Sequence, residues 1–221
     1  MNDSAIYALV DHTLLSPTAT WEAIQIICEE AVKYGTASVC IPPSFVQRVK
    51  QKYGGRINIC TVIGFPLGYN TTASKLAEIN NANVDGANEF DVVINLGDAK
   101  DKHFDKITEE LTALKKAVGS KILKVIIECC YLTTDEKIAL CNCVTQSGAD
   151  FIKTSTGFGT GGATIEDIKL FKRHIGSNVQ IKAAGGMKTR EDFIAFINEG
   201  CSRLGTSSAV KVLTGGVSGT Y

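Results

Sequence analysis

Residues 149–186 read ADFIKTSTGFGTGGATIEDIKLFKRHIGSNVQIKAAGG, and this stretch contains two short apolar runs that each end in a lysine. The segments that contain these runs, 150–153 and 179–183, favour β-strands, and the segment 165–172 between them has the pattern of an amphipathic helix. A strand, a helix and a second strand in this order are typical of a βαβ unit with parallel, neighbouring strands. Lys153 and Lys182 are therefore expected at the same edge of one sheet.

The same alternation of strand and helix runs along the whole chain. It predicts one (β/α)8 TIM barrel over residues 1–221, an α/β fold that begins with a short N-terminal helix. An open, doubly wound parallel sheet is the alternative, and eight units without a large insertion favour the closed barrel. The further expected strands lie at 9–13, 37–41, 57–63, 88–94, 121–127 and 203–205. The further expected helices lie at 20–34, 44–52, 72–84, 101–118, 134–146, 190–199 and 207–213.

Composition and charge exclude several classes of protein. The chain has 23 basic and 23 acidic residues, so its formal net charge is zero, and nothing favours nucleic acid or an anionic membrane as a partner. The N-terminal residues do not resemble a signal peptide, and no apolar run approaches the roughly 18 residues of a membrane span. The eight cysteines form no CxxC pair or zinc-like spacing. We therefore expect a cytoplasmic protein with free thiols and without a metal or cofactor.

In a TIM barrel the functional residues gather at the carboxyl ends of the strands. Polar or small residues stand at these positions in most of the predicted strands, so they are expected to converge on one pocket. They are Asp11, Cys40, Gly64, Asp91, Glu128, Lys153, Lys182 and the segment 205–208.

The two lysines predict Schiff-base chemistry. Burial or a neighbouring cation lowers the pKa of a lysine, so one amine of a close pair can be neutral and attack a carbonyl while the other stays charged. The alternative is that each lysine only marks the point where a strand meets water. Lys124 begins a predicted strand, so we expect it at the opposite end of the barrel with a structural role.

Two carboxylates are candidate partners for these lysines. In the strand at 88–94, Glu89, Asp91 and Val93 share one face, which leaves Asp91 pointing into the barrel, where a carboxylate needs a cation. A buried ion pair without chemistry is the alternative. Asp11 is a weaker second carboxylate. Cys40 is expected in the pocket wall, because no histidine partner for a cysteine nucleophile is evident.

Small residues after the last three strands predict a phosphate site. The segments at 154–162, 183–186 and 205–208 allow backbone N–H groups to approach an anion, at the positions where barrel enzymes often bind phosphate. The segment 157–162 also matches G-x-G-x-x-G, but no acidic residue ends the next strand, which disfavours a dinucleotide. The three scattered histidines, His12, His103 and His174, disfavour a metal centre.

Several motifs together resemble the deoxyribose-phosphate aldolase family. Single motifs are weak, but their order and spacing along nearly the whole chain are specific. They are DHTLL (11–15), VCIPPSFV (39–46), VIGFPLG (62–68), GANEFDVVIN (86–95), KVIIE (124–128), DFIKTSTGF (150–158), IKAAGG (181–186) and LGTSS (204–208). The resemblance implies a class I aldolase that needs no metal and cleaves 2-deoxy-D-ribose 5-phosphate to D-glyceraldehyde 3-phosphate and acetaldehyde.

The resemblance also assigns roles to residues. It implies that Lys153 forms the Schiff base, that Lys182 is a proton donor and acceptor that lowers the pKa of Lys153, and that Asp91 is an acid/base, with Asp11 in support. The implied phosphate-binding residues are Thr156, Gly157, Gly185, Gly186, Ser207 and Ser208. Some family members carry a lysine in place of Phe158, and Cys129 replaces a threonine that usually follows KVIIE. Tyr221, at the end of the chain, is a further candidate for the pocket.

Two other functions remain open at this stage: a metal-dependent sugar-phosphate aldolase or isomerase, and a non-catalytic barrel that binds phosphorylated sugars. A small phosphorylated sugar is the expected partner in each case. Relatives in the family are commonly dimers or tetramers, so the resemblance also implies a homo-oligomer.

Overall fold

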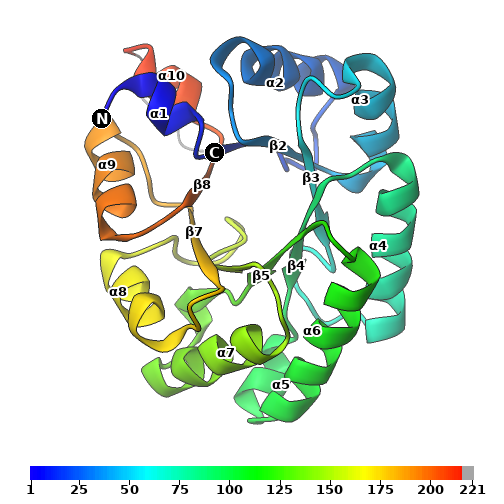
Figure 1. The fold of residues 1–221 in the computed structure, drawn as a ribbon, viewed down its shortest axis with the longest axis vertical. Helices are drawn as coiled ribbons and strands as arrows, with labels where there is room; N and C mark the ends of the chain where they lie inside the picture. The colour runs from blue at the N-terminus through cyan, green and yellow to red at the C-terminus, as the bar shows by residue number, and fades with distance from the viewer. Residues whose placement is uncertain (216–221) are drawn as a thin grey trace.

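The computed structural model describes residues 1–215, in which eight parallel strands close into a barrel through the pairing of the first strand with the last. Neighbouring strands follow the order of the chain, and the helices form a ring outside them (Figure 1). This closure confirms the predicted (β/α)8 TIM barrel and rules out the open sheet. The strands are β1 (Val10–Thr13), β2 (Ser38–Ile41), β3 (Ile59–Ile63), β4 (Glu89–Val93), β5 (Ile122–Ile126), β6 (Phe151–Lys153), β7 (Gln180–Ala184) and β8 (Arg203–Thr206).

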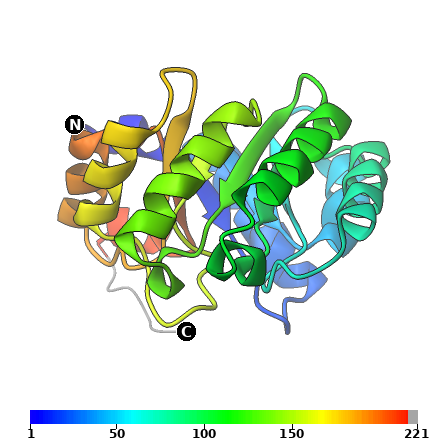
Figure 2. The ribbon, with the colours of Figure 1, turned by 90° about the horizontal axis from the view of Figure 1, so that it is seen from below.

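The helices lie outside the barrel and alternate with the strands, as the view from the side also shows (Figure 2). Two 3-10 turns, η1 (Pro43–Phe45) and η2 (Cys129–Tyr131), follow β2 and β5. The α-helices are α1 (Asp3–Tyr7), α2 (Trp21–Tyr34), α3 (Val46–Tyr53), α4 (Thr72–Asp85), α5 (Leu96–Lys100), α6 (Phe104–Val118), α7 (Thr134–Gln146), α8 (Ile165–His174), α9 (Arg190–Glu199) and α10 (Ala209–Leu213).

Local capping explains why several helix boundaries could be predicted. In α7 the hydroxyl of Thr133 accepts a hydrogen bond from the N–H of Glu136, and the Glu136 carboxylate accepts one from the N–H of Thr133. This capping box satisfies two backbone donors at the start of the helix. The helix α9 has the same arrangement between Thr189 and Asp192, and both helices have the predicted bounds.

The predicted long helix over 101–118 was wrong at its N-terminal end. The structure has a short helix α5 before it, which the Asn95 side chain caps by accepting from the N–H groups of Gly97 and Asp98. Lys102 then adopts a φ of 60°, a left-handed conformation that cannot continue a helix. The α6 helix therefore begins only at Phe104. Similarly, the helix expected at 44–52 starts as the 3-10 turn η1 and becomes α3 at Val46.

The two faces of the strands separate an apolar layer from a charged interior. Phe90 and Val92 of β4 are fully buried in the apolar core shared with the helices. Glu89 and Asp91 of the same strand belong to a network of ion pairs with lysines and an arginine. The predicted alternation along this strand is confirmed, and it places charged side chains inside the barrel.

The α7 capping box gives a prediction about stability. Replacing Thr133 with Ala leaves the Glu136 N–H without its side-chain acceptor, so the free energy of unfolding should fall by about 1 kcal/mol. Urea unfolding measures the change. Thr112→Ala is the control, because this exposed threonine lies inside α6 and bonds only to the carbonyl of Thr108, and its effect should stay within about 0.5 kcal/mol. Equal losses in the two variants would show that the capping box does not stabilise α7.

Candidate active site

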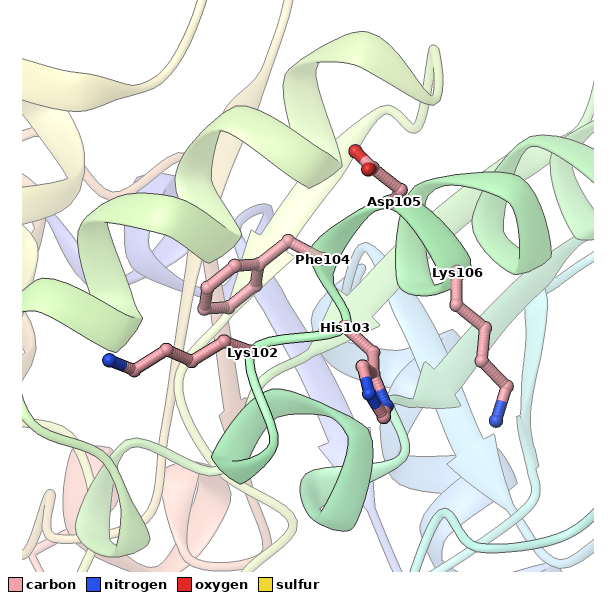
Figure 3. A pocket seen from close by; sticks show the side chains of 5 residues that line it. All are labelled: Lys102, His103, Phe104, Asp105 and Lys106. Atoms are coloured by element: carbon pink, nitrogen blue, oxygen red, sulfur yellow. The ribbon is translucent and has the colours of Figure 1, made fainter.

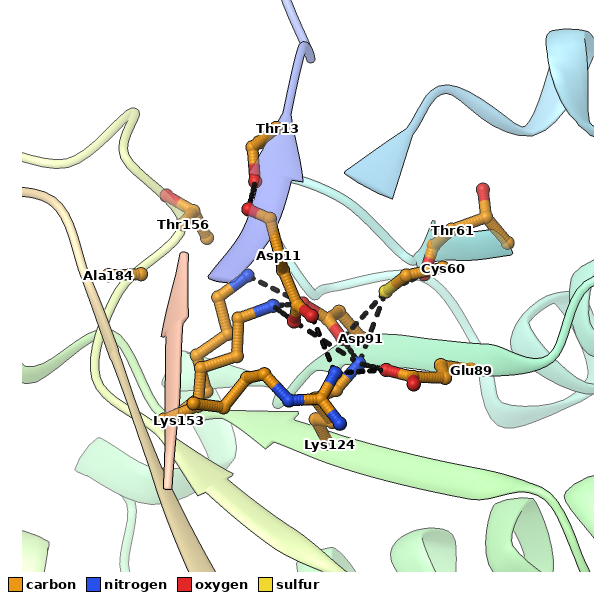
Figure 4. Close-up of polar contacts among 12 residues, drawn as sticks. Asp11, Thr13, Cys60, Thr61, Glu89, Asp91, Lys124, Lys153, Thr156 and Ala184 are labelled. Carbon is orange, nitrogen blue, oxygen red and sulfur yellow. Dashed lines mark hydrogen bonds and ion pairs between the residues drawn. The ribbon is translucent and has the colours of Figure 1, made fainter. Parts of the chain in front are cut away.

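The carboxylate of Asp91 is the centre of the buried charges inside the barrel (Figure 4). Its Oδ2 atom accepts hydrogen bonds from Lys153 Nζ and Lys182 Nζ, each at 2.7 Å. Its Oδ1 atom accepts from Lys124 Nζ at 2.9 Å. Lys153 and Lys182 are paired in register on the neighbouring strands β6 and β7, so both amines reach the same oxygen. The structure thus brings together the two lysines and the aspartate singled out in the sequence.

A second set of contacts surrounds this centre. Asp11 accepts hydrogen bonds from Lys182 Nζ, from Arg203 Nη1 at 2.6 Å and from Ser38 Oγ at 2.6 Å. Glu89 lies 2.6 Å from Lys124 Nζ and 2.8 Å from Arg203 Nη1. The Lys182 side chain fits because β8 carries a glycine beside it: a Cβ on Gly205 would lie 2.9 Å from Lys182 Cε. Asp11 therefore belongs to the network, and Glu89 and Arg203 are members that the sequence analysis missed.

The expected position of Lys124 was wrong. Lys124 lies in the middle of β5, in register with Asp91, and is fully buried with its amine inside the barrel. The prediction treated this lysine as the start of a strand. The alternation of side chains along β5 places it on the inner face, opposite to Leu123 and Val125, which belong to the apolar core.

The network shifts the pKa values of Asp11, Asp91 and Lys182. Burial alone would raise the pKa of Asp91, but Lys124, Lys153 and Lys182 hold it well below its usual range. Burial would also raise the pKa of Asp11, and Lys124, Lys182 and Arg203 lower it instead. For Lys182 burial favours the neutral amine, but Asp11 and Asp91 outweigh burial and raise its pKa. Lys182 therefore stays charged beside Lys153.

A cavity of about 480 Å³ opens above this network at the carboxyl ends of the strands. Within residues 1–215, Lys153 is the one member of the charged network that lines it, with 3% of its side chain exposed. Lys182 and Asp91 are fully buried behind it. The lining residues are Thr13, Leu15, Ser16, Pro17, Lys153, Thr156, Gly157, Phe158, Ala184, Gly185, Gly186, Met187, Lys188, Gly205, Thr206, Ser207 and Ser208.

All six expected phosphate-binding residues lie in this lining, although they come from three different loops. The loops after β6 and β7 touch through their backbones, since a Cβ on Gly162 would lie 2.5 Å from the carbonyl carbon of Gly185. The N–H of Ala163 donates to the carbonyl of Ala184 at 3.0 Å in the same region. Lys188 also lines the cavity and adds a positive charge that the sequence analysis missed.

Cys40 does not line the cavity, contrary to expectation. It is fully buried in a small cluster with Cys60 and Val62, and the cavity residue Leu15 packs against that cluster. Burial raises the pKa of Cys60, whose thiol donates to Asp91 Oδ1 at 3.1 Å. Cys40, Cys60 and Asp91 could together offer ligand atoms to a metal ion. An ion there would lie beside the three ammonium groups that already bond to Asp91, so the charges favour lysine chemistry.

Two other features lie apart from this site. A pocket at the start of α6 is lined by the consecutive residues 102–106 and brings together no side chains from distant parts of the described chain (Figure 3). Tyr221 lies outside the described residues, so its expected approach to the cavity stays a prediction. None of the described helices is long and apolar enough to cross a membrane.

A closed parallel barrel with buried lysines under a cavity at the carboxyl ends of its strands defines a TIM-barrel enzyme. The sequence matches the DeoC/LacD family aldolases over residues 5–219. It is 64% identical over 215 residues to a deoxyribose-phosphate aldolase of Clostridium botulinum (strain Alaska E43 / Type E3), covering 97% of each chain. The chain belongs to the DeoC/LacD aldolase family, and it is therefore a carbon–carbon lyase.

Solved structures support the same assignment. A putative deoxyribose-phosphate aldolase from Coccidioides immitis has a TM-score of 0.93 and 38% identity, covering 97% of this chain and 86% of that one. The deoxyribose phosphate aldolase from Aeropyrum pernix, described as a unique tetramer, has a TM-score of 0.90 and 30% identity, covering 96% of this chain and 91% of that one. Both likenesses extend over the whole barrel.

The lowered pKa values of Asp11 and Asp91 predict how stability changes in acid. An unfolded aspartate has a pKa of about 3.9, so the stabilisation is fully present above that pH and is lost as the pH falls further, because the unfolded chain then binds protons that the folded chain does not. Each carboxylate contributes a slope of up to about 1.4 kcal/mol per pH unit in this range.

Urea unfolding between neutral pH and the acid range measures this dependence. Asp11→Asn should lower stability at neutral pH and flatten the acid slope. Asp3→Asn, which removes a half-exposed carboxylate paired with Arg190, is the control for the loss of one carboxylate outside the buried network. An unchanged slope in Asp11→Asn would contradict the lowered pKa.

Proposed function

We propose that the protein is a class I aldolase that reversibly cleaves 2-deoxy-D-ribose 5-phosphate to D-glyceraldehyde 3-phosphate and acetaldehyde, with Lys153 as the Schiff-base lysine. One observation carries the assignment of the nucleophile. Lys153 and Lys182 both bond to Asp91, but Lys153 reaches the cavity and Lys182 does not. A carbonyl bound in the cavity can therefore meet the amine of Lys153.

The count of charges supports a neutral amine at this position. Four basic groups (Lys124, Lys153, Lys182 and Arg203) share three carboxylates (Asp11, Glu89 and Asp91), so one base is in excess. Loss of a proton from Lys153 leaves the buried network without net charge. Each of the other three cations pairs with at least two carboxylates. A buried charge without a partner is energetically unfavourable. Lys153 is therefore the base with the fewest carboxylate partners, and it is the one that faces the cavity.

The reaction then proceeds in steps that the network can serve. Neutral Lys153 adds to the C1 aldehyde, and loss of water gives a cationic imine that draws electrons from the C2–C3 bond. Asp91, through Lys182 and a water molecule, takes the proton of the C3 hydroxyl as this bond breaks. Asp11 keeps Lys182 charged and in place. Reprotonation of the enamine and hydrolysis then release acetaldehyde and restore Lys153.

The phosphate group is proposed to bind at the far end of the cavity from Asp91. Backbone N–H groups can bind an anion at Gly157, Gly185 and Gly186. Hydroxyl groups can do so at Ser207 and Ser208, and all five residues line the cavity. Phe158 stands where some members of the family have a lysine, and Lys188 can supply a positive charge from the next loop. Binding energy from the phosphate holds the sugar in register with Lys153.

The remaining expectations belong to the same proposal. We infer that residues 1–221 form a single aldolase domain, that the enzyme works in the cytoplasm and that it assembles with copies of itself. The tetramer described for the Aeropyrum pernix enzyme supports an oligomer. A metal-dependent aldolase or isomerase is the alternative, and loss of activity with a chelator would favour it.

Trapping the imine tests the nucleophile. Borohydride added together with substrate should reduce the imine of bound acetaldehyde, leave an N-ethyl group on Lys153 and inactivate the enzyme. Peptide mapping by mass spectrometry locates the group. Lys153→Ala should lose both the modification and the cleavage of deoxyribose 5-phosphate, whereas Lys169→Ala, which removes an exposed lysine of α8, should keep both. A modification confined to another lysine would sink the assignment.

Replacing Lys182 tests the charged partner. Lys182→Leu removes the ammonium between Asp11 and Asp91, so kcat should fall by about 10²–10⁴-fold, the usual contribution of a general acid or base. The folded state should persist because Lys124, Lys153 and Arg203 still balance the carboxylates, which circular dichroism can check. Lys169→Leu is the matched control. Turnover close to the wild-type rate at neutral pH would contradict the proposed role.

A further inference from the structure

Glu128 has a strained backbone next to the cavity. Its φ of 53° and ψ of 67° lie in the left-handed region, and within residues 1–215 only Lys102 shares a positive φ among the non-glycine residues. This conformation is unfavourable for a residue with a side chain, so it persists where surrounding contacts hold it. The side chain of Glu128 is also buried, with 3% exposed. Such a carboxylate needs hydrogen-bond donors.

The donors come from the loop after β6. The N–H of Thr156 lies 3.1 Å and 3.3 Å from the two carboxylate oxygens of Glu128, and the hydroxyl of Thr156 donates to Glu128 Oε2. The same hydroxyl accepts from the N–H of Phe158 at 3.0 Å. A chain of hydrogen bonds therefore runs from the carboxylate through Thr156 to Phe158.

The loop also packs against this carboxylate. A Cβ on Gly159 would lie 3.2 Å from Glu128 Cδ, so the chain passes close to the carboxyl group. Before Thr156 the backbone has other supports, because Lys153 bonds to Asp91 and Thr154 exchanges hydrogen bonds with Ala184. The contacts of Glu128 thus act on the part of the loop that begins at Thr156.

We propose that Glu128 is a positioning residue that sets the phosphate-binding conformation of the loop 156–159. The N–H and hydroxyl of Thr156 are committed to Glu128, so the surface this loop offers to an anion is formed by Gly157 and its neighbours. Glu128 does not line the cavity and acts through Thr156. The identity of the phosphate ligand rests on the proposed function, whereas the contacts of Glu128 do not depend on it.

The test compares a substrate that has a phosphate with one that lacks it. In Glu128→Gln one acceptor oxygen becomes a donor that faces the donors of Thr156. Loss of such buried hydrogen bonds should raise KM for 2-deoxyribose 5-phosphate by about tenfold or more. Glu128→Gln should lower kcat/KM for unphosphorylated 2-deoxyribose several-fold less than it lowers kcat/KM for 2-deoxyribose 5-phosphate. The reason is that the loop has no phosphate to bind in the unphosphorylated sugar.

Glu136→Gln is the matched control. Glu136 also accepts a hydrogen bond from the backbone N–H of a threonine, but it caps α7 away from the cavity. This variant should keep the wild-type KM for both substrates. If Glu128→Gln does not fold, Glu128→Gly replaces it, since glycine suits the left-handed backbone while removing the carboxylate.

A double-mutant cycle separates positioning from general loss of stability. Thr156→Val removes the hydroxyl and should reproduce the selective rise in KM. Because both changes break one chain of hydrogen bonds, the double variant should be no worse than the more damaging single variant. Additive effects would contradict the proposed connection.

Binding of inorganic phosphate, followed by 31P NMR, gives a measurement that does not depend on catalysis. It should weaken by a similar factor in Glu128→Gln. Equal losses for the two substrates, or unchanged phosphate affinity, would overturn the proposal. If the wild-type protein cleaves neither substrate, the proposed function fails, and phosphate affinity still decides the role of Glu128.

Discussion

One buried carboxylate organises the interior of this barrel. Asp91 lies at its centre on β4, and the amines of Lys124, Lys153 and Lys182 bond to it from β5, β6 and β7. Each of these charges is buried beside an opposite charge, because an unpaired charge in a protein interior costs several kcal/mol. Removing one partner therefore lowers the free energy of unfolding, even where the complete network adds little to it. The strands that carry these side chains must consequently keep a fixed register relative to one another, so that each charge stays beside its partner.

The same constraint links stability to reactivity. The network holds four basic groups and three carboxylates, so one base is in excess. Lys153 has a single carboxylate partner and faces the cavity, and it is the proposed nucleophile. Lys182 has two carboxylate partners and stays charged beside it. The proposed nucleophile and its proton-transfer partner thus differ in their surroundings and have the same side chain.

The features that could be predicted from the sequence are those that depend on local patterns of apolar and polar residues. The alternation of strands and helices determined the barrel, and period-two alternation placed Asp91 inside it. The break at Lys102 depends on one left-handed residue, which no periodic pattern indicates. The predicted position of Lys124 was wrong because this residue was taken as the start of a strand. The side-chain alternation along β5, which points Lys124 into the barrel, was not used. Arg203, Glu89 and Glu128 act through contacts between residues 28 to 192 positions apart, and a single sequence does not show such pairs.

The proposed chemistry and the proposed recognition of phosphate occupy separate layers of the molecule. The charged network lies within the strands, where the closed sheet fixes every backbone, while the proposed anion site is built from loops that follow β6, β7 and β8. Lys153 ends β6, and Thr156 lies only three residues beyond it. The charged network and the loop after β6 are therefore directly connected along the chain. A loop that close to the nucleophile must be held firmly, or its motion would displace the substrate from Lys153. The proposed restraint comes from the carboxylate of Glu128, which lies two residues beyond the end of β5 and has a strained, left-handed backbone.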